Sequence, residues 1–185
     1  MKSILFTLFL FFSFYVVEAQ SFEKVPKLKT FEAGYRYNYS NSYSDLSANG
    51  LTIAFDYAWQ LSGFGKKKAA YISVPLGYTY FPSDGSGKNA SLIYYGWTVR
   101  HNLAKDKKFI PYLGYNLLLN QLKFKGVSGR DIGHETRFEF GYNIHLKEKQ
   151  EWVIKLEYGM TFIPSFNQTK SQSIKYFGLK TGFRF

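Results

Sequence analysis

Residues 176–185 close the chain with Tyr-Phe-Gly-Leu-Lys-Thr-Gly-Phe-Arg-Phe, a stretch that alternates in character. One parity carries Phe177, Leu179, Phe183 and Phe185, and the other carries Gly178, Lys180, Gly182 and Arg184. Because successive side chains of a strand point to opposite faces, such a strand has one apolar face and one cationic face. A soluble barrel would turn its apolar face inward, whereas lipid outside and a polar lumen inside require the reverse. The stretch therefore predicts a membrane-spanning β-strand.

The same alternation recurs along the chain, and no stretch of any length has the period of an amphipathic helix. The candidate strands are residues 31–39, 51–61, 72–80, 93–100, 112–120, 137–146, 152–162 and 176–185. Most of them place an inward glycine beside an outward large residue, as in Gly141-Tyr142. We expect these glycines to make room for long inward side chains in a narrow barrel. The prediction is an all-β fold, an eight-stranded antiparallel up-and-down transmembrane β-barrel.

The expected connections alternate in length. Longer ones follow the first, third, fifth and seventh strands, at 40–49, 82–89, 121–134 and 163–172. Tight, lysine-rich ones follow the second, fourth and sixth strands, at 62–68, 104–108 and 147–150. Barrels of the bacterial outer membrane have long extracellular loops and short periplasmic turns. We therefore expect both termini on the periplasmic side, with the turn lysines near lipid headgroups.

Residues 1–19 have the pattern of a secretory signal peptide. Lys2 supplies the charged start, residues 4–17 are apolar, and Val17-Glu18-Ala19 forms a small-residue cleavage site. A retained membrane anchor is the alternative, but the apolar run is shorter than the roughly 20 residues that a spanning helix needs. The predicted organisation is a signal peptide at 1–19 and one barrel domain at 20–185.

Composition excludes several classes of function. The chain has no cysteine, which rules out disulfides, thiolate metal sites and a lipidated N-terminus. Aromatic residues make up 21% of the chain while mean hydropathy is −0.24, a combination that suits strands with one polar face. Nucleic acid is an alternative partner for a chain with a pI near 9.6, but no basic helix or stacking module supports it. No cofactor is expected, and His101 and His145 lack neighbours at metal-ligand spacing.

The inward parity of the predicted strands carries charges of both signs: Glu32, Arg36, Asp56, Arg100, Arg137, Glu139, Lys155, Glu157, Lys180 and Arg184. They could line an ion-selective pore, or they could pair and fill the lumen. An unpaired buried charge costs several kcal/mol, and an eight-stranded lumen leaves little room for water. We therefore predict a paired network that plugs the barrel.

On this strand pattern and its terminal Phe185, the chain resembles small outer-membrane β-barrels of the OmpA-transmembrane and OmpX type from Gram-negative bacteria. The resemblance implies that Phe177, Leu179, Phe183 and Phe185 form the signal read by the barrel-insertion machinery. It also implies a monomer whose partners are outer-membrane lipids and lipopolysaccharide. The expected role is non-enzymatic, structural or adhesive, through the extracellular loops, and a narrow pore is an alternative.

Some eight-stranded barrels are lipid A deacylases with a lipid-facing histidine, a serine and an acid. Here His134, Glu135 and Ser128 are the one grouping with these residue types near the outer rim. In that family the histidine lies two residues before the serine, but two residues after His134 the chain has Thr136. A nucleophile must also reach its base. We therefore assign no catalytic or metal-binding residue and expect a protein that is not an enzyme, with a lipid A hydrolase as the alternative.

Overall fold

The computed structural model of the chain describes residues 27–61, 70–83, 85, 88–104, 108–147, 150–164 and 171–185. The predicted signal peptide at 1–19 lies outside these residues, and so does the predicted tight turn at 62–68. Within the described ranges, no helix is both long enough and apolar enough to cross a membrane.

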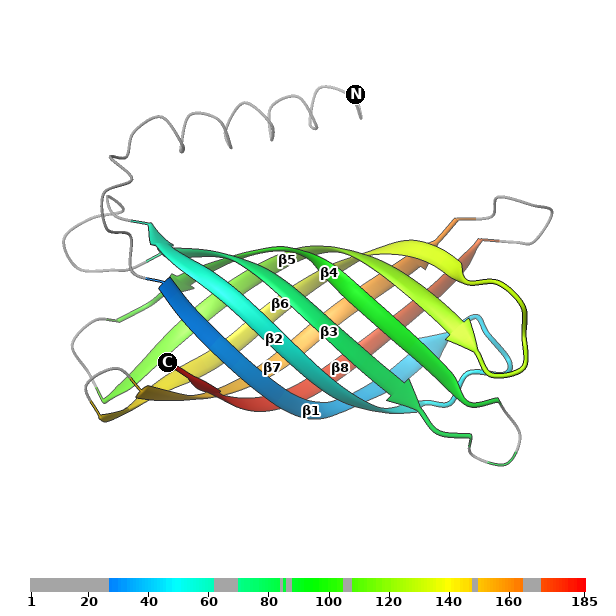
Figure 1. The fold of residues 1–185 in the computed structure, drawn as a ribbon, viewed down its shortest axis with the longest axis horizontal. Helices are drawn as coiled ribbons and strands as arrows, with labels where there is room; N and C mark the ends of the chain where they lie inside the picture. The colour runs from blue at the N-terminus through cyan, green and yellow to red at the C-terminus, as the bar shows by residue number, and fades with distance from the viewer. Residues whose placement is uncertain are drawn as a thin grey trace, which may run out of the picture.

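Strands of the chain form a closed antiparallel barrel in sequence order, which confirms the predicted fold class. They are β1 (Lys27–Asn41), β2 (Asn49–Leu61), β3 (Ala70–Phe81), β4 (Ala90–Asn102), β5 (Phe109–Phe124), β6 (Asp131–Lys147), β7 (Gln150–Ile163) and β8 (Gln172–Arg184). All strands are tilted to the long axis, and β1 begins at the end where β8 finishes (Figure 1). We call this the terminal end, and we call the opposite end the mouth.

Each strand is longer than its cleanly alternating part. The largest difference concerns the predicted loop 121–134, because β5 runs on to Phe124 and β6 already begins at Asp131. Gln121 pairs with Ile132 and Leu122 with Asp131, so the hairpin ladder continues and leaves only 125–130 as the connection. The β2–β3 connection, 62–69, is as long as the 82–89 connection at the mouth, so the predicted alternation of lengths holds only in part.

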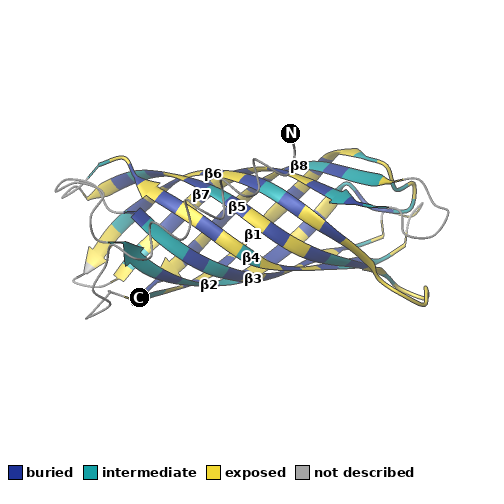
Figure 2. Cartoon of the chain, turned by 90° about the horizontal axis from the view of Figure 1, so that it is seen from above, coloured by how far each residue is buried: buried dark blue, intermediate teal, exposed yellow. Residues whose placement is uncertain are grey.

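The wall of the barrel has opposite characters on its two faces. Buried and exposed residues alternate along every strand, as the banded ribbon in Figure 2 shows. The exposed face is apolar and includes Phe31, Leu51, Ile53, Leu76, Trp97, Phe138, Leu156, Phe177, Leu179 and Phe183. Soluble monomers rarely expose contiguous apolar surface on this scale. A continuous apolar belt of this kind fits lipid rather than water.

The barrel closes where β8 meets β1. Lys29 and Phe185 exchange two backbone hydrogen bonds of 2.9 Å, just beyond the last residue of β8. On the outer face the ring of Phe185 stacks near that of Phe31, with centroids 6.2 Å apart. Phe183 stacks in the same way on Trp152 of β7, with centroids 6.1 Å apart. The C-terminal aromatic residues thus hold both seams of the final strand.

We predict that Phe185→Ala weakens closure of the barrel, because it removes the aromatic contact at the last pair of the β1–β8 seam. Unpaired backbone groups in hydrocarbon cost several kcal/mol each. The variant should therefore insert poorly and should yield less of the fast-migrating folded form on gels of unheated membranes.

Phe109→Ala is the matched control, since Phe109 is an equally exposed aromatic at the first residue of β5 but lies away from the closing seam. It should leave the folded form near the wild-type amount. Equal losses in the two variants would contradict a special role for the terminal residue.

Candidate functional site: the filled lumen and its mouth

The ten charged residues predicted to face inward all lie buried in the lumen of the barrel: Glu32, Arg36, Asp56, Arg100, Arg137, Glu139, Lys155, Glu157, Lys180 and Arg184. An eleventh buried charge, Glu135 of β6, joins them and is 1% exposed. It lies two residues before Arg137, on the same parity. Extending the alternation of that strand by one step would have found it.

Nearer the terminal end, one group of contacts centres on Arg100. This residue donates to Asp56 Oδ2 at 2.7 Å and to Glu139 Oε2 at 3.0 Å. Lys155 Nζ lies 2.7 Å from Glu32 Oε2 and 3.1 Å from Glu139 Oε1. Glu139 therefore bridges the two cations, and every one of these side chains has an oppositely charged partner.

Nearer the mouth, Arg137 organises a second group. Its guanidinium lies 2.6 Å from Glu135 Oε1 and 3.2 Å from Glu157 Oε1. It also donates to the hydroxyl of Tyr176 at 2.7 Å, and that hydroxyl in turn donates to Glu135 at 2.6 Å. Lys180 Nζ lies 2.8 Å from the Glu157 oxygen that Arg137 contacts. Each carboxylate in this group therefore meets more than one donor.

Further contacts join and extend the two groups. Lys155 Nζ lies 3.4 Å from Glu157 Oε1, and Arg36 lies 3.4 Å from Glu135 Oε2. The joined network has as many carboxylates as cations: Glu32, Asp56, Glu135, Glu139 and Glu157 with Arg36, Arg100, Arg137, Lys155 and Lys180. The charge of this network is thus compensated, as burial at this depth requires, and Arg184 lies outside it, paired with Glu151 at 3.0 Å.

Three inward tyrosines fill the space between the ions, each lying over a glycine of a neighbouring strand. The directly paired residues are Gly77 with Tyr94, Gly141 with Tyr112, and Gly159 with Tyr176. A Cβ atom on Gly77 would fall within 2.0 Å of the Tyr94 ring. The glycines therefore make room for aromatic rings at these positions, and not only for charged side chains as the sequence predicted.

An apolar cluster lies in the lumen towards the mouth, a feature that the sequence analysis missed. Buried aliphatic and aromatic side chains pack together there: Leu46, Phe81, Leu92, Leu118, Leu122, Ile163 and Ile174, with Tyr43 and Phe124 against them. Most of them lie on the inward parity at the strand ends, beyond the segments whose alternation was clean. This apolar layer lies towards the mouth and meets the ionic network, since the guanidinium of Arg36 lies 5.7 Å from the centre of the Phe81 ring.

The β1–β2 connection, 42–48, folds over this layer. Its residue Leu46 is buried against the layer, and Asn41 donates to the Leu46 carbonyl at 3.0 Å. Tyr43 reaches across the mouth and donates to Asp131 Oδ2 at 3.0 Å. Burial, and then this hydrogen bond, raises the pKa of Tyr43, so its hydroxyl stays neutral. The connection acts as a fixed cover over the lumen.

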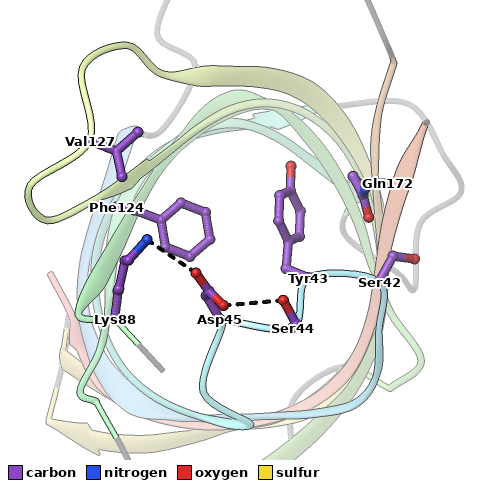
Figure 3. Close-up of a pocket in the computed structure, with 8 residues that line it drawn as sticks. All are labelled: Ser42, Tyr43, Ser44, Asp45, Lys88, Phe124, Val127 and Gln172. Atoms are coloured by element: carbon purple, nitrogen blue, oxygen red, sulfur yellow. Dashed lines mark hydrogen bonds and ion pairs between the residues drawn. The ribbon is translucent and has the colours of Figure 1, made fainter. Parts of the chain in front are cut away.

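A pocket of about 210 Å³ remains between this cover and the rim. The residues that line it are Ser42, Tyr43, Ser44, Asp45, Lys88, Phe124, Val127 and Gln172. Tyr43 and Phe124 project into the opening from opposite sides (Figure 3), with ring centroids 5.5 Å apart. Asp45 accepts from Ser44 and pairs with Lys88 at 3.2 Å, and the hydrogen bond from Lys88 lowers the pKa of Asp45.

The residues considered for hydrolysis do not meet as a catalytic group. His134 lies in β6, not in a loop, with its side chain exposed on the outer face, whereas Glu135 is buried in the lumen. Consecutive strand residues point to opposite faces, so the barrel wall separates this pair. Ser128 lies exposed in the 125–130 connection. His145 contacts Glu151 at 3.1 Å, and the described part of the chain holds no cluster of three or more metal-ligating side chains.

Solved structures with the same architecture support the interpretation of the fold. Neisserial surface protein A superposes with a TM-score of 0.61 at 15% identity, over 85% of this chain and 94% of that one. The chain has the fold of a small outer-membrane β-barrel. The outer membrane enzyme PagL matches with a TM-score of 0.56 at 11% identity, over 85% of this chain and 98% of that one. OprG of Pseudomonas aeruginosa matches at 0.53 and 12% identity, over 87% and 95%.

No protein-family model and no curated protein sequence matches the chain. The identities to these outer-membrane barrels are low enough that the likeness carries the fold and not an activity. One of the three is named as an enzyme, so the barrel fold alone does not decide between catalytic and non-catalytic roles. That decision rests on the side chains of this chain.

We predict that Gly77→Ala destabilises the barrel by about 1–3 kcal/mol, the usual cost of overpacking. The added methyl would overlap the ring of Tyr94, a buried residue that accepts a hydrogen bond from Lys180. Urea unfolding in detergent, followed by tryptophan fluorescence, measures the loss.

Gly178→Ala tests whether the effect is specific to the ring contact. Gly178 is also an inward strand glycine, but the nearest atom to its added Cβ would be a carboxylate oxygen of Glu157 at 3.1 Å. It should cost less than about 1 kcal/mol, because the contact at 3.1 Å is far less severe than the 2.0 Å overlap at Gly77 and is relieved by a small shift. A larger loss at Gly178 than at Gly77 would show that the tyrosine fit is not what limits substitution.

Proposed function

We propose that the chain is an outer-membrane protein whose barrel is closed to solutes and which acts at its mouth. In this proposal the mature domain, 20–185, is a monomer with both termini in the periplasm and the mouth at the cell exterior. The role is then structural or adhesive, carried by the connections at the mouth. The apolar outer belt and the outer-membrane barrels of like fold support the location.

The observation that carries the proposal is the double closure of the lumen. The ionic network occupies its middle, and the apolar layer under the β1–β2 connection lies towards its mouth. A pore needs a continuous wet path, whereas paired ions and close-packed apolar side chains leave little space for one. A barrel filled in this way is suited to support the connections at its mouth rather than to conduct ions.

The proposal extends to assembly and to the surrounding lipid. The end of the chain presents four exposed, outward apolar side chains: Phe177, Leu179, Phe183 and Phe185. A signal that the insertion machinery reads must be accessible in this way. Once inserted, the same face would contact outer-membrane lipids and lipopolysaccharide. Nucleic acid has no place in this proposal.

Lipid A hydrolysis is not the function that the geometry favours. The barrel wall separates His134 from Glu135, and Glu135 is fully engaged by Arg137, Arg36 and Tyr176. A carboxylate held in that way inside the lumen cannot orient a histidine on the lipid face. We expect the lipid A acylation pattern, read by mass spectrometry, to be the same with His134→Ala as with the wild-type chain.

We predict that Lys180→Glu lowers the stability of the barrel by about 3–5 kcal/mol without opening it, because the change removes one cation paired with Glu157 and places a second buried carboxylate beside it. The midpoint of urea unfolding in detergent should fall, while planar-bilayer recordings should show negligible current for both forms.

Lys175→Glu is the matched control, because Lys175 lies five residues before Lys180 on β8, on the outward parity near the mouth. It makes the same charge change outside the network and should shift the unfolding midpoint much less. A stable Lys180→Glu variant with cation-selective current would overturn the closed-lumen proposal, because only a hydrated pore would screen the new charge.

A further inference from the structure

The outward face of the β5–β6 hairpin carries two cations at the mouth, the end of the barrel opposite the chain termini (Figure 1). Lys123 of β5 has the outward parity of Gln121. Arg130 lies just before β6, and its guanidinium donates to Gln121 Oε1 at 2.9 Å. Both cationic side chains are exposed. Among the residues that the structure describes, no carboxylate lies within ion-pair distance of either cation.

The carboxylate closest to these cations in the sequence faces the other way. Asp131 pairs with the buried Leu122 and accepts from Tyr43 at 3.0 Å, so it lies on the inward side of the wall. Lys123 and Arg130 are the next residues of the two strands beyond that pair. Like charges on one face of neighbouring strands repel each other, so this face favours an anion that the two cations share.

The two cations lie at the edge of the apolar belt. Lys123 pairs with Ser91 of β4, and Ser91 pairs with Tyr80 of β3, so the three side chains form one outward row. Tyrosine is enriched at membrane–water interfaces, because its ring suits hydrocarbon and its hydroxyl suits the headgroups. The row therefore indicates the level of lipid headgroups, and Ser91 adds a hydroxyl beside Lys123.

Apolar side chains begin directly below this row on the same face. Gln121 pairs with Ile93 on one side and with Ile132 on the other. Ile132 and Leu119 are 56% and 51% exposed. A free anion gains nothing from such a surface, whereas the acyl chains of a lipid bury apolar area against it. The combination of cations above and aliphatic side chains below fits an anionic lipid.

We propose that this outward face binds a phosphate monoester of an outer-leaflet glycolipid, the phosphate of lipid A. Lys123 and Arg130 share the phosphate, and Ser91 donates to it. The acyl chains lie along Ile93 and Ile132. A phosphate monoester carries about 1.5–2 negative charges at pH 7, which matches two cations better than the single charge of a phosphodiester does. The assignment rests on the proposed function, because it requires the mouth to lie at the outer leaflet.

The test is native mass spectrometry of the purified barrel in detergent, which counts the lipids that it retains. The probes are lipid A with both phosphates, lipid A with both removed, phosphatidylglycerol and inorganic phosphate. Each cation should contribute about fivefold in affinity, so we expect dephosphorylated lipid A to bind about 25-fold more weakly. Phosphatidylglycerol should bind about fivefold more weakly, and inorganic phosphate should not be retained, because it has no acyl chains.

Lys123→Gln and Arg130→Gln should each lower the affinity for phosphorylated lipid A about fivefold and leave the urea midpoint unchanged, since both side chains are exposed. Lys88→Gln is the matched control, because Lys88 is a cation of the mouth that lines the inward pocket and pairs with Asp45. It should leave lipid A affinity unchanged. An equal loss with Lys88→Gln would show that only the total charge of the mouth matters and would overturn the assignment.

Three results with the probes would also overturn it. Equal affinity for dephosphorylated lipid A would mean that the cations take no part. Equal affinity for phosphatidylglycerol would mean that any anionic lipid suffices. Retention of inorganic phosphate as strong as that of lipid A would mean that the site binds a free anion.

Orientation is measured separately, because lipid binding in detergent does not depend on which way the barrel faces in the cell. The chain has no cysteine, so Ser128→Cys in the exposed 125–130 connection supplies a single thiol. We expect a membrane-impermeant maleimide to label it on intact cells. Lipid A binding without labelling would contradict the proposed function, whereas labelling without lipid A binding would overturn the phosphate site alone.

Discussion

In a hydrocarbon layer no water is present to satisfy backbone N–H and C=O groups, so the first and last strands of a sheet must pair and close it into a barrel. The Lys29–Phe185 hydrogen bonds and the ladder between β1 and β8 meet that requirement here. Closure with so few strands then fixes how narrow the interior is. The outward apolar belt, the inward polar filling and the close approach of neighbouring strands all follow from this single constraint.

A narrow lumen must be filled by side chains, and here side chains of different chemical character fill it. Ions pair in the middle, tyrosine rings lie over glycines of adjacent strands, and aliphatic side chains pack towards the mouth. The rings of Tyr94 and Tyr176 lie against the guanidinium groups of Arg137 and Arg36, at 4.5 Å and 3.5 Å, so these cations contact aromatic faces as well as carboxylates.

The period of two in the sequence was enough to predict the strands, their number and which charges face inward, because alternation is forced by strand geometry. It did not extend to strand ends, where inward residues change from polar to apolar. For this reason Leu122 was missed as a member of the inner layer and Glu135 as a member of the network, whereas Leu118 lies on the inward parity inside the predicted strand 112–120 and could have been found there. The mouth pocket could not be predicted from the sequence, since it depends on how the 42–48 connection folds back and on the hydrogen bond from Tyr43 to Asp131.

The origin of the network in the chain bears on how the barrel assembles. Its members come from β1, β2, β4, β6, β7 and β8, and the pair of Arg36 and Glu135 is separated by 99 positions. No hairpin taken alone holds a complete set of partners, so a half-built sheet would carry unmatched charges on its inner face. Because the entropic cost of closing long loops must be met before such distant contacts form, a barrel of this topology folds slowly. The interior ion pairs therefore stabilise only the closed barrel. This makes assembly cooperative and leaves partly closed intermediates unstable.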